Sequence, residues 1–107
     1  MADKWKLSYL PLFYDDLNEA VTYISDVLEN PKAANDLLND VEEAILKRLP
    51  EADEFPEYRT SRKRPLPYYT IRIRNFSVFY VVIEAGEEKI MEVRRFLYRK
   101  RDIEKLI

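Results

Sequence analysis

The stretch from Tyr68 to Ile83, YYTIRIRNFSVFYVVI, constrains the fold of this chain more than any other segment. Apolar and polar residues alternate from Tyr69 to Ile73, and a period of two places them on opposite faces of a strand. The run from Phe76 to Ile83 is aromatic and β-branched almost throughout, which is typical of a central strand covered on both faces. We therefore predict two antiparallel strands joined by a tight turn near Asn75.

Four further segments have patterns of regular structure. Trp5 to Leu10 alternates as a short strand with one buried face, and Lys89 to Tyr98 is predicted to be the last strand. Apolar residues recur at helical spacing from Phe13 to Leu28 and from Pro31 to Leu49, which predicts two amphipathic helices. The residues expected to face the core are Phe13, Leu17, Val21, Ile24 and Leu28 in the first helix, and Ala34, Leu37, Leu38, Val41, Ala44, Ile45 and Leu49 in the second.

The boundaries of these elements are marked by turn and capping residues. Asn30 suits the N-cap of the second helix and Pro31 its first position. Gly86 is expected to supply a positive φ in the turn before the last strand, and Asp102 to cap a short final helix. The order β-α-α-β-β-β(-α) predicts an α+β fold, a single domain in which a helical hairpin packs on a mostly antiparallel four-stranded sheet.

The residue types that are missing exclude several kinds of site. The 107 residues include no His, no Cys and one Gly. Imidazole or thiolate metal sites, thiol chemistry, serine-protease triads and glycine-rich phosphate loops are therefore excluded. The acids are spread over the helices as a solvated face, so we expect no metal site and no small-molecule cofactor. No run of apolar residues is long enough to cross a bilayer, and we expect a cytoplasmic protein without a membrane partner.

Charge is divided unevenly along the chain. Residues 1–58 contain 5 Lys/Arg and 14 Asp/Glu, whereas residues 59–101 contain 12 Lys/Arg and 4 Asp/Glu. A basic half built on a sheet suggests a polyanionic partner such as nucleic acid. The long loop at residues 51–67 ends in a basic cluster that is either a solvated flexible surface or a clamp for phosphates. We assign to nucleic-acid binding Arg62, Lys63, Arg64, Arg74 and Lys100.

Two motifs resemble the RelE/ParE superfamily of toxins from bacterial type II toxin–antitoxin systems. Phe76, Val78 and Tyr80 match the superfamily's aromatic strand, and the segment RRFLYRKRD matches its terminal motif "R-V-L-H-x-x-R-D". The order of elements agrees over essentially the whole chain. The sequence departs from the pattern at Ser77, where the nuclease branch often has Arg, and at Tyr98, where the motif usually has His.

The resemblance implies a toxin with a cognate antitoxin that covers its groove. RelE-like members cleave messenger RNA on the ribosome, whereas ParE-like members inhibit DNA gyrase and cleave nothing. We expect a metal-independent, ribosome-dependent endoribonuclease. The alternatives are a gyrase inhibitor and an inactive or repurposed member.

A metal-free ribonuclease needs cations for the phosphorane charge and groups that transfer protons. Arginine suits the first task because its planar fork pairs with two phosphate oxygens. Arg72 and Arg74 on one strand and Arg95 on another are expected to converge on the outer face of the sheet, where they are either solvated or bind phosphate. The residues predicted to be catalytic are Arg72, Arg95, Tyr98 and Arg101.

Overall fold

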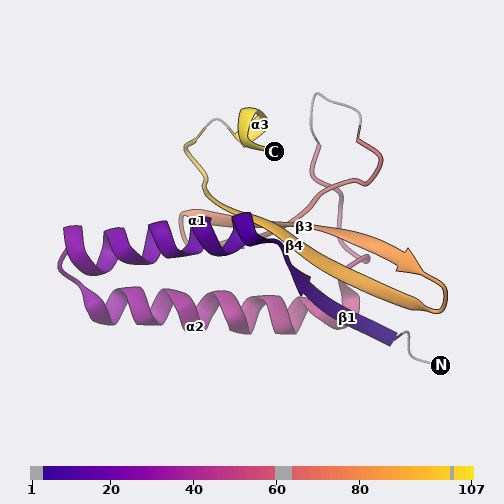
Figure 1. The fold of residues 1–107 in the computed structure, drawn as a ribbon, viewed down its shortest axis with the longest axis horizontal. Helices are drawn as coiled ribbons and strands as arrows, with labels where there is room; N and C mark the ends of the chain where they lie inside the picture. Colours follow the sequence, from indigo (N-terminus) through magenta and orange to yellow (C-terminus); the bar gives the residue numbers. More distant parts are fainter. Residues whose placement is uncertain (1–3, 60–63, 102) are drawn as a thin grey trace.

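The structure, a computed structural model, describes residues 4–59, 64–101 and 103–107 (Figure 1). The order is strand, two helices, three strands and a short helix, as predicted. The elements are β1 (Lys4–Tyr9), α1 (Pro11–Thr22), the π-helical turn η1 (Tyr23–Val27), α2 (Pro31–Arg48), the 3₁₀ turn η2 (Leu49–Glu51), β2 (Tyr69–Ile73), β3 (Phe76–Ala85), β4 (Glu88–Tyr98) and α3 (Ile103–Leu106).

The four strands form one sheet in the order β1-β4-β3-β2. β2 and β3 are antiparallel with Arg72 opposite Ser77, and β3 and β4 are antiparallel with Phe76 opposite Tyr98. β1 runs parallel to β4, and their pairing ends at Tyr9. Beyond that residue the second half of β4 is still paired with β3 but has no strand on its other side, where α1 lies. The open edge of β4 is where the groove described below is found.

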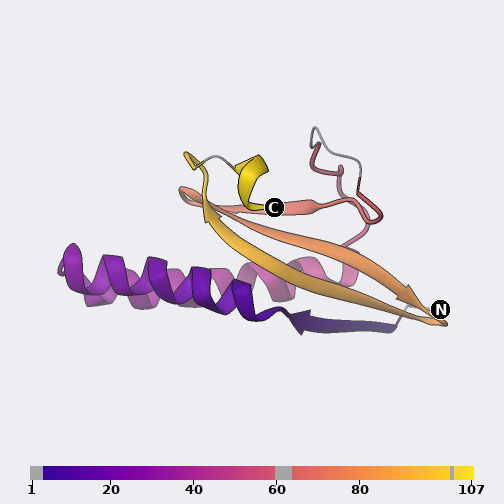
Figure 2. The same ribbon diagram turned by 45° about the horizontal axis from the view of Figure 1, so that its top comes forward.

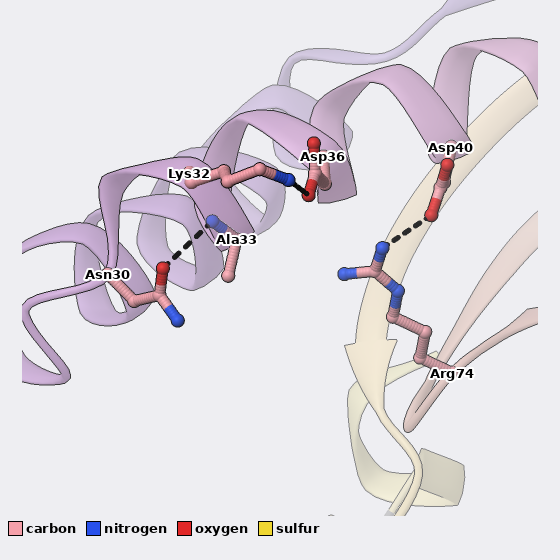
Figure 3. Close-up of polar contacts among 6 residues, drawn as sticks. All are labelled: Asn30, Lys32, Ala33, Asp36, Asp40 and Arg74. Carbon is pink, nitrogen blue, oxygen red and sulfur yellow. Dashed lines mark hydrogen bonds and ion pairs between the residues drawn. The ribbon is translucent and has the colours of Figure 1, made fainter.

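The two helices form the predicted antiparallel hairpin on one face of the sheet (Figure 2). The Asn30 side chain accepts a hydrogen bond from the Ala33 amide at 3.1 Å, and Pro31 occupies the first turn (Figure 3). A Lys32–Asp36 ion pair spans the following turn at 2.9 Å. This cap confirms the predicted start of the second helix. Gly86 has the expected positive φ of 65°.

The central strand β3 is buried on both sides, as its composition predicted. Its helix-facing side joins the main core with Phe13, Leu37, Val41 and Ile45. Its other side joins a smaller core, which the loop before β2 and helix α3 cover. The smaller core consists of Tyr68, Phe79, Val81 and Leu97, with Tyr58, Leu66, Ile83, Ile103, Leu106 and Ile107 packed against it.

Two residues predicted to be in the core are exposed. Leu38 is 36% exposed, because it lies about 100° around the helix from the fully buried Leu37. Leu28 is 56% exposed because the π-helical turn before it adds residues to the turn and rotates the following positions off the core-facing stripe. The first helix also begins at Pro11, two residues earlier than predicted.

A buried polar network joins α2 to the sheet. The Tyr80 hydroxyl donates to the Ala52 carbonyl at 2.7 Å and accepts from Arg48 Nη1 at 2.9 Å. Arg48 also donates to the Thr70 carbonyl at 3.1 Å, and its guanidinium lies 3.5 Å from the centroid of the Phe55 ring. Burial raises the pKa of Tyr80, although the hydrogen bond from Arg48 opposes this. The network therefore ties β2, β3 and the end of α2 together around a neutral phenol.

Tyr80→Phe is expected to lower the free energy of unfolding by about 1–3 kcal/mol, because the Ala52 carbonyl and one Arg48 donor lose a buried partner. Chemical denaturation at pH 7 measures this. The matched control is Tyr14→Phe, which removes a hydroxyl from a side chain that is 50% exposed and is expected to change stability by less than about 0.5 kcal/mol. Equal effects of the two variants would contradict the role given to the network.

The same phenol predicts a loss of stability in alkali. Tyr80 keeps its proton in the folded chain above pH 10, where the unfolded chain releases it, so the unfolded state binds fewer protons and stability falls as pH rises. Denaturation between pH 9 and 11 is expected to show a steeper fall for the native sequence than for Tyr80→Phe. Parallel curves would show that Tyr80 does not contribute to the slope.

Candidate functional site: a groove beside the open strand edge

A groove of about 540 Å³ lies between the first helix and the end of the sheet. It opens where β1 has ended, so that the second half of β4 is paired with β3 on one side and has no strand on the other. One wall comes from α1 and η1, and the other from the β2–β3 turn, β3 and β4. The residues that line it are Asp16, Glu19, Ala20, Tyr23, Ile24, Leu28, Asn75, Phe76, Phe96, Tyr98 and Arg101.

The sheet wall of the groove is aromatic. Phe76 stacks on Phe96 with ring centroids 4.7 Å apart, and Tyr98 contacts Phe76 edge-on at 5.6 Å. Tyr98 remains 38% exposed. A surface of this kind suits the apolar side chains of a protein segment more than a small polar substrate.

The helical wall owes its shape to the π-helical turn η1. This turn supplies Tyr23 and Ile24 to the groove, and Leu28 follows directly after it. Tyr23 and Leu28 are 53% and 56% exposed, so this end of the hairpin presents apolar surface to solvent. Single π-helical turns within α-helices occur frequently at functional sites. Here the turn leaves Tyr23 and Leu28 exposed at the groove, whereas Ile24 also packs against the main core.

Arg95 lies on the outer face of the sheet as predicted, opposite Phe79, but it is not available there as a cation for phosphate. Its Nε and Nη2 donate to the two carboxylate oxygens of Asp16 at 2.7 and 2.9 Å, and its Nη1 donates to the Leu106 carbonyl at 2.7 Å. The Arg95 and Asp16 side chains are only 15% and 9% exposed. The pKa of Arg95 is raised, chiefly by the hydrogen bond to Asp16. The guanidinium is thus committed to linking α1, β4 and α3.

Asp16 has a second task at the same place. Its Oδ2 accepts a hydrogen bond from the Phe96 amide at 3.0 Å. This amide belongs to the part of β4 that extends past the end of β1, so the carboxylate takes the place of the missing strand. Sequence reasoning treated Asp16 as one of several surface acids. Nothing local distinguishes it from Asp15, because its partners lie about 80 positions away in the chain.

The three strand arginines do not converge as predicted. Arg74 occupies the β2–β3 turn with a φ of 55°, and its guanidinium pairs with Asp40 on α2 at 2.5 Å (Figure 3). It therefore points to the helical side, because the left-handed turn takes it out of the strand's alternation. Arg72 is exposed, in register with Ser77 and Leu97 on the opposite side from the helices. Arg95 is the buried link described above.

The other predicted residues are distributed between the groove and the surface. Tyr98 and Arg101 line the groove, and Lys100 is exposed beside them. Arg64 is half-buried with its guanidinium 5.0 Å from the centroid of the Tyr68 ring. Arg62 and Lys63, and the expected cap Asp102, lie outside the described residues.

Two of the helical residues that line the groove belong to the apolar stripe that was predicted to face the core. Ile24 and Leu28 were expected to be buried, and Glu19, Ala20 and Tyr23 were assigned no role. The signal that could have identified them is Tyr23 itself, a large aromatic residue just off an otherwise complete apolar stripe. Sequence alone does not reveal the π-helical turn that moves the end of this stripe into the groove.

Across residues 4–59, 64–101 and 103–107, no cluster of three or more Asp or Glu side chains is arranged to hold a metal ion. In that same part of the chain, no helix combines the length and apolar character that crossing a membrane requires.

Comparison with known proteins identifies the family. Residues 7–103 match the family model described as the ParE toxin of type II toxin–antitoxin system, parDE. A search of curated proteins found no match. A solved structure described as the chromosomal ParDE TA system from P. aeruginosa is similar, with a TM-score of 0.62 and 20% identity over 86% of this chain and 92% of that one. That structure supports the fold, and the match over residues 7–103 shows that this chain belongs to the ParE toxin family of type II toxin–antitoxin systems, within the RelE/ParE superfamily.

Proposed function

We propose that this toxin arrests growth by inhibiting DNA gyrase and does not cleave RNA. The observation that carries the proposal is the commitment of Arg95. The Arg95 guanidinium donates to both Asp16 oxygens and to the Leu106 carbonyl. It therefore has no pair of N–H donors available for bidentate binding of a phosphate. Arg74 is paired with Asp40 on the helical side, so the cations that a metal-free ribonuclease would gather are divided among separate places.

Membership of the ParE family supports the same choice. ParE-like members of the superfamily act on gyrase, whereas the endoribonucleases are RelE-like. This chain has Ser77 where the nuclease branch often has Arg, and Tyr98 where the terminal motif usually has His. Ser77 is buried between Arg72 of β2 and Leu97 of β4, so it has little surface with which to contact a substrate.

A cognate antitoxin is the partner that a toxin of this family implies, and we propose that it docks in the groove. The aromatic sheet wall and the exposed Tyr23 and Leu28 offer anchor sites for the apolar side of an amphipathic segment. Glu19 and Arg101 stand among these apolar residues and would fix the register of the segment through charge.

A paired assay tests the activity class. Purified toxin is added to gyrase with relaxed plasmid, and separately to ribosomes carrying a defined message. We expect loss of supercoiling, trapped gyrase–DNA complexes and intact messages. New 5′ ends on ribosome-bound message, reduced on the order of 10²-fold by Arg101→Ala, would instead establish the RelE-like activity.

A further inference from the structure

Three exposed cations lie at the end of the sheet next to the groove. They are Arg72, Arg99 and Lys100, and we call them the cationic tip. Arg72 comes from β2, and the other two come from the segment after β4. The Arg99 amide donates to the Asn75 carbonyl at 2.9 Å, which joins the two segments. The tip therefore brings together parts of the chain that are about 25 residues apart.

The backbone of the cationic tip is held in place. Phe76 is paired with Tyr98 directly behind it, and the Arg101 amide closes a turn onto the Tyr98 carbonyl at 3.0 Å. The Arg74–Asp40 pair fixes the turn against α2. Arg72, Arg99 and Lys100 extend from this frame into solvent. Cations on a fixed frame lose little backbone entropy on binding, so their contacts with an anion contribute more affinity.

We propose that the cationic tip binds the phosphate backbone of duplex DNA. Arg and Lys contacts with phosphate supply most of the affinity of binding that is independent of sequence. A single-stranded partner would need aromatic rings on which bases stack. The nearest ring, Tyr98, contacts Phe76 and forms the wall of the groove. The tip thus offers charge beside one aromatic ring, which is already in contact with Phe76.

The choice of DNA over another duplex polyanion rests on the proposed gyrase target, because a gyrase inhibitor works beside the DNA that gyrase holds. Binding of the tip to the DNA phosphate backbone would keep the toxin next to the enzyme–DNA complex. Since the groove faces α1 and the exposed tip residues extend from the end of the sheet, the same toxin would present one surface to protein and one to DNA.

Fluorescence anisotropy with a labelled 20-base-pair DNA tests the inference without gyrase. With three phosphate contacts, raising salt from 50 to 200 mM is expected to weaken binding about 40-fold. The triple variant Arg72→Gln, Arg99→Gln, Lys100→Gln is expected to reduce the slope of log affinity against log salt by about 2 to 3 units. Arg101 is left unchanged because it lines the groove.

The matched control removes three exposed charges elsewhere. Lys6→Gln, Lys32→Gln, Lys47→Gln produces the same change in net charge, from residues of β1 and α2. This control variant is expected to keep most of the slope of log DNA affinity against log salt. Equal losses in both triple variants, no binding by the native sequence, or tighter binding to single-stranded DNA or RNA would each overturn the inference. Retained antitoxin binding shows that both variants are folded.

Gyrase assays on the same variants separate this inference from the proposed function. If the native toxin inhibits gyrase and the tip variant inhibits equally with unchanged DNA affinity, the inference fails and the function stands. If the native toxin binds DNA through the tip but leaves supercoiling unchanged, the function fails and the DNA contact stands.

Discussion

Asp16→Ala is expected to lower the free energy of unfolding by about 3–5 kcal/mol. Removing one partner of a buried ion pair leaves the other charge uncompensated, which has a cost of this size. Here the change leaves Arg95 facing a cavity and deprives the Phe96 amide of its acceptor. The effect is measured by urea denaturation followed by circular dichroism, at a pH near 7.

Asp15→Ala is the control, because it removes the same group from the adjacent, exposed position. It is expected to change stability by less than about 0.5 kcal/mol. A double-mutant cycle with Arg95→Ala isolates the coupling of the pair. If Asp16→Ala and Asp15→Ala were equally mild, the carboxylate would not be supporting the open edge of β4.

Leu28→Glu is expected to weaken antitoxin binding on the order of 10²-fold, which corresponds to about 3 kcal/mol. The change replaces an apolar anchor of the groove with a charge that binding would bury. Because Leu28 is 56% exposed, the toxin is expected to fold normally. Titration calorimetry with the cognate antitoxin measures the loss, and cells expressing both proteins should no longer be protected.

The matched control is Leu46→Glu on α2, where the leucine is 50% exposed and outside the groove. Its affinity for the antitoxin is expected to remain within about threefold of the native value, since surface changes away from an interface have small effects. Full protection of cells expressing Leu28→Glu would place the antitoxin on another face. Inhibition of gyrase by both variants would show that the groove serves the antitoxin alone.

Local periodicity was sufficient to predict most of the fold. The alternation from Tyr69 to Ile73 identified the buried face of β2, and Asn30 followed by Pro31 marked the start of α2. These signals work because strand and helix periods are properties of neighbouring residues. The composition of β3 likewise predicted its place in the middle of the sheet.

The site was predicted less well because its geometry depends on contacts between distant segments. The strand pattern put Arg95 on one face, but the pattern contains no information about an acid that approaches from α1. Arg74 was misplaced because a positive φ in the turn breaks the alternation that was assumed for it. Tyr98 and Arg101 do lie together in the groove, since both follow from the end of the last strand.

The parallel pairing of β1 with β4 has a consequence for synthesis on the ribosome. Lys4 pairs with Glu88, so β1 must wait for a strand that begins 84 positions later before it can join the sheet. Pairings so distant in sequence are slow to form, and domains are translated at about 5–20 residues per second. A nascent chain therefore completes neither its groove nor its cationic tip until residues 96–101 have been made, which leaves several seconds after the synthesis of β1 during which the toxin is present but unassembled.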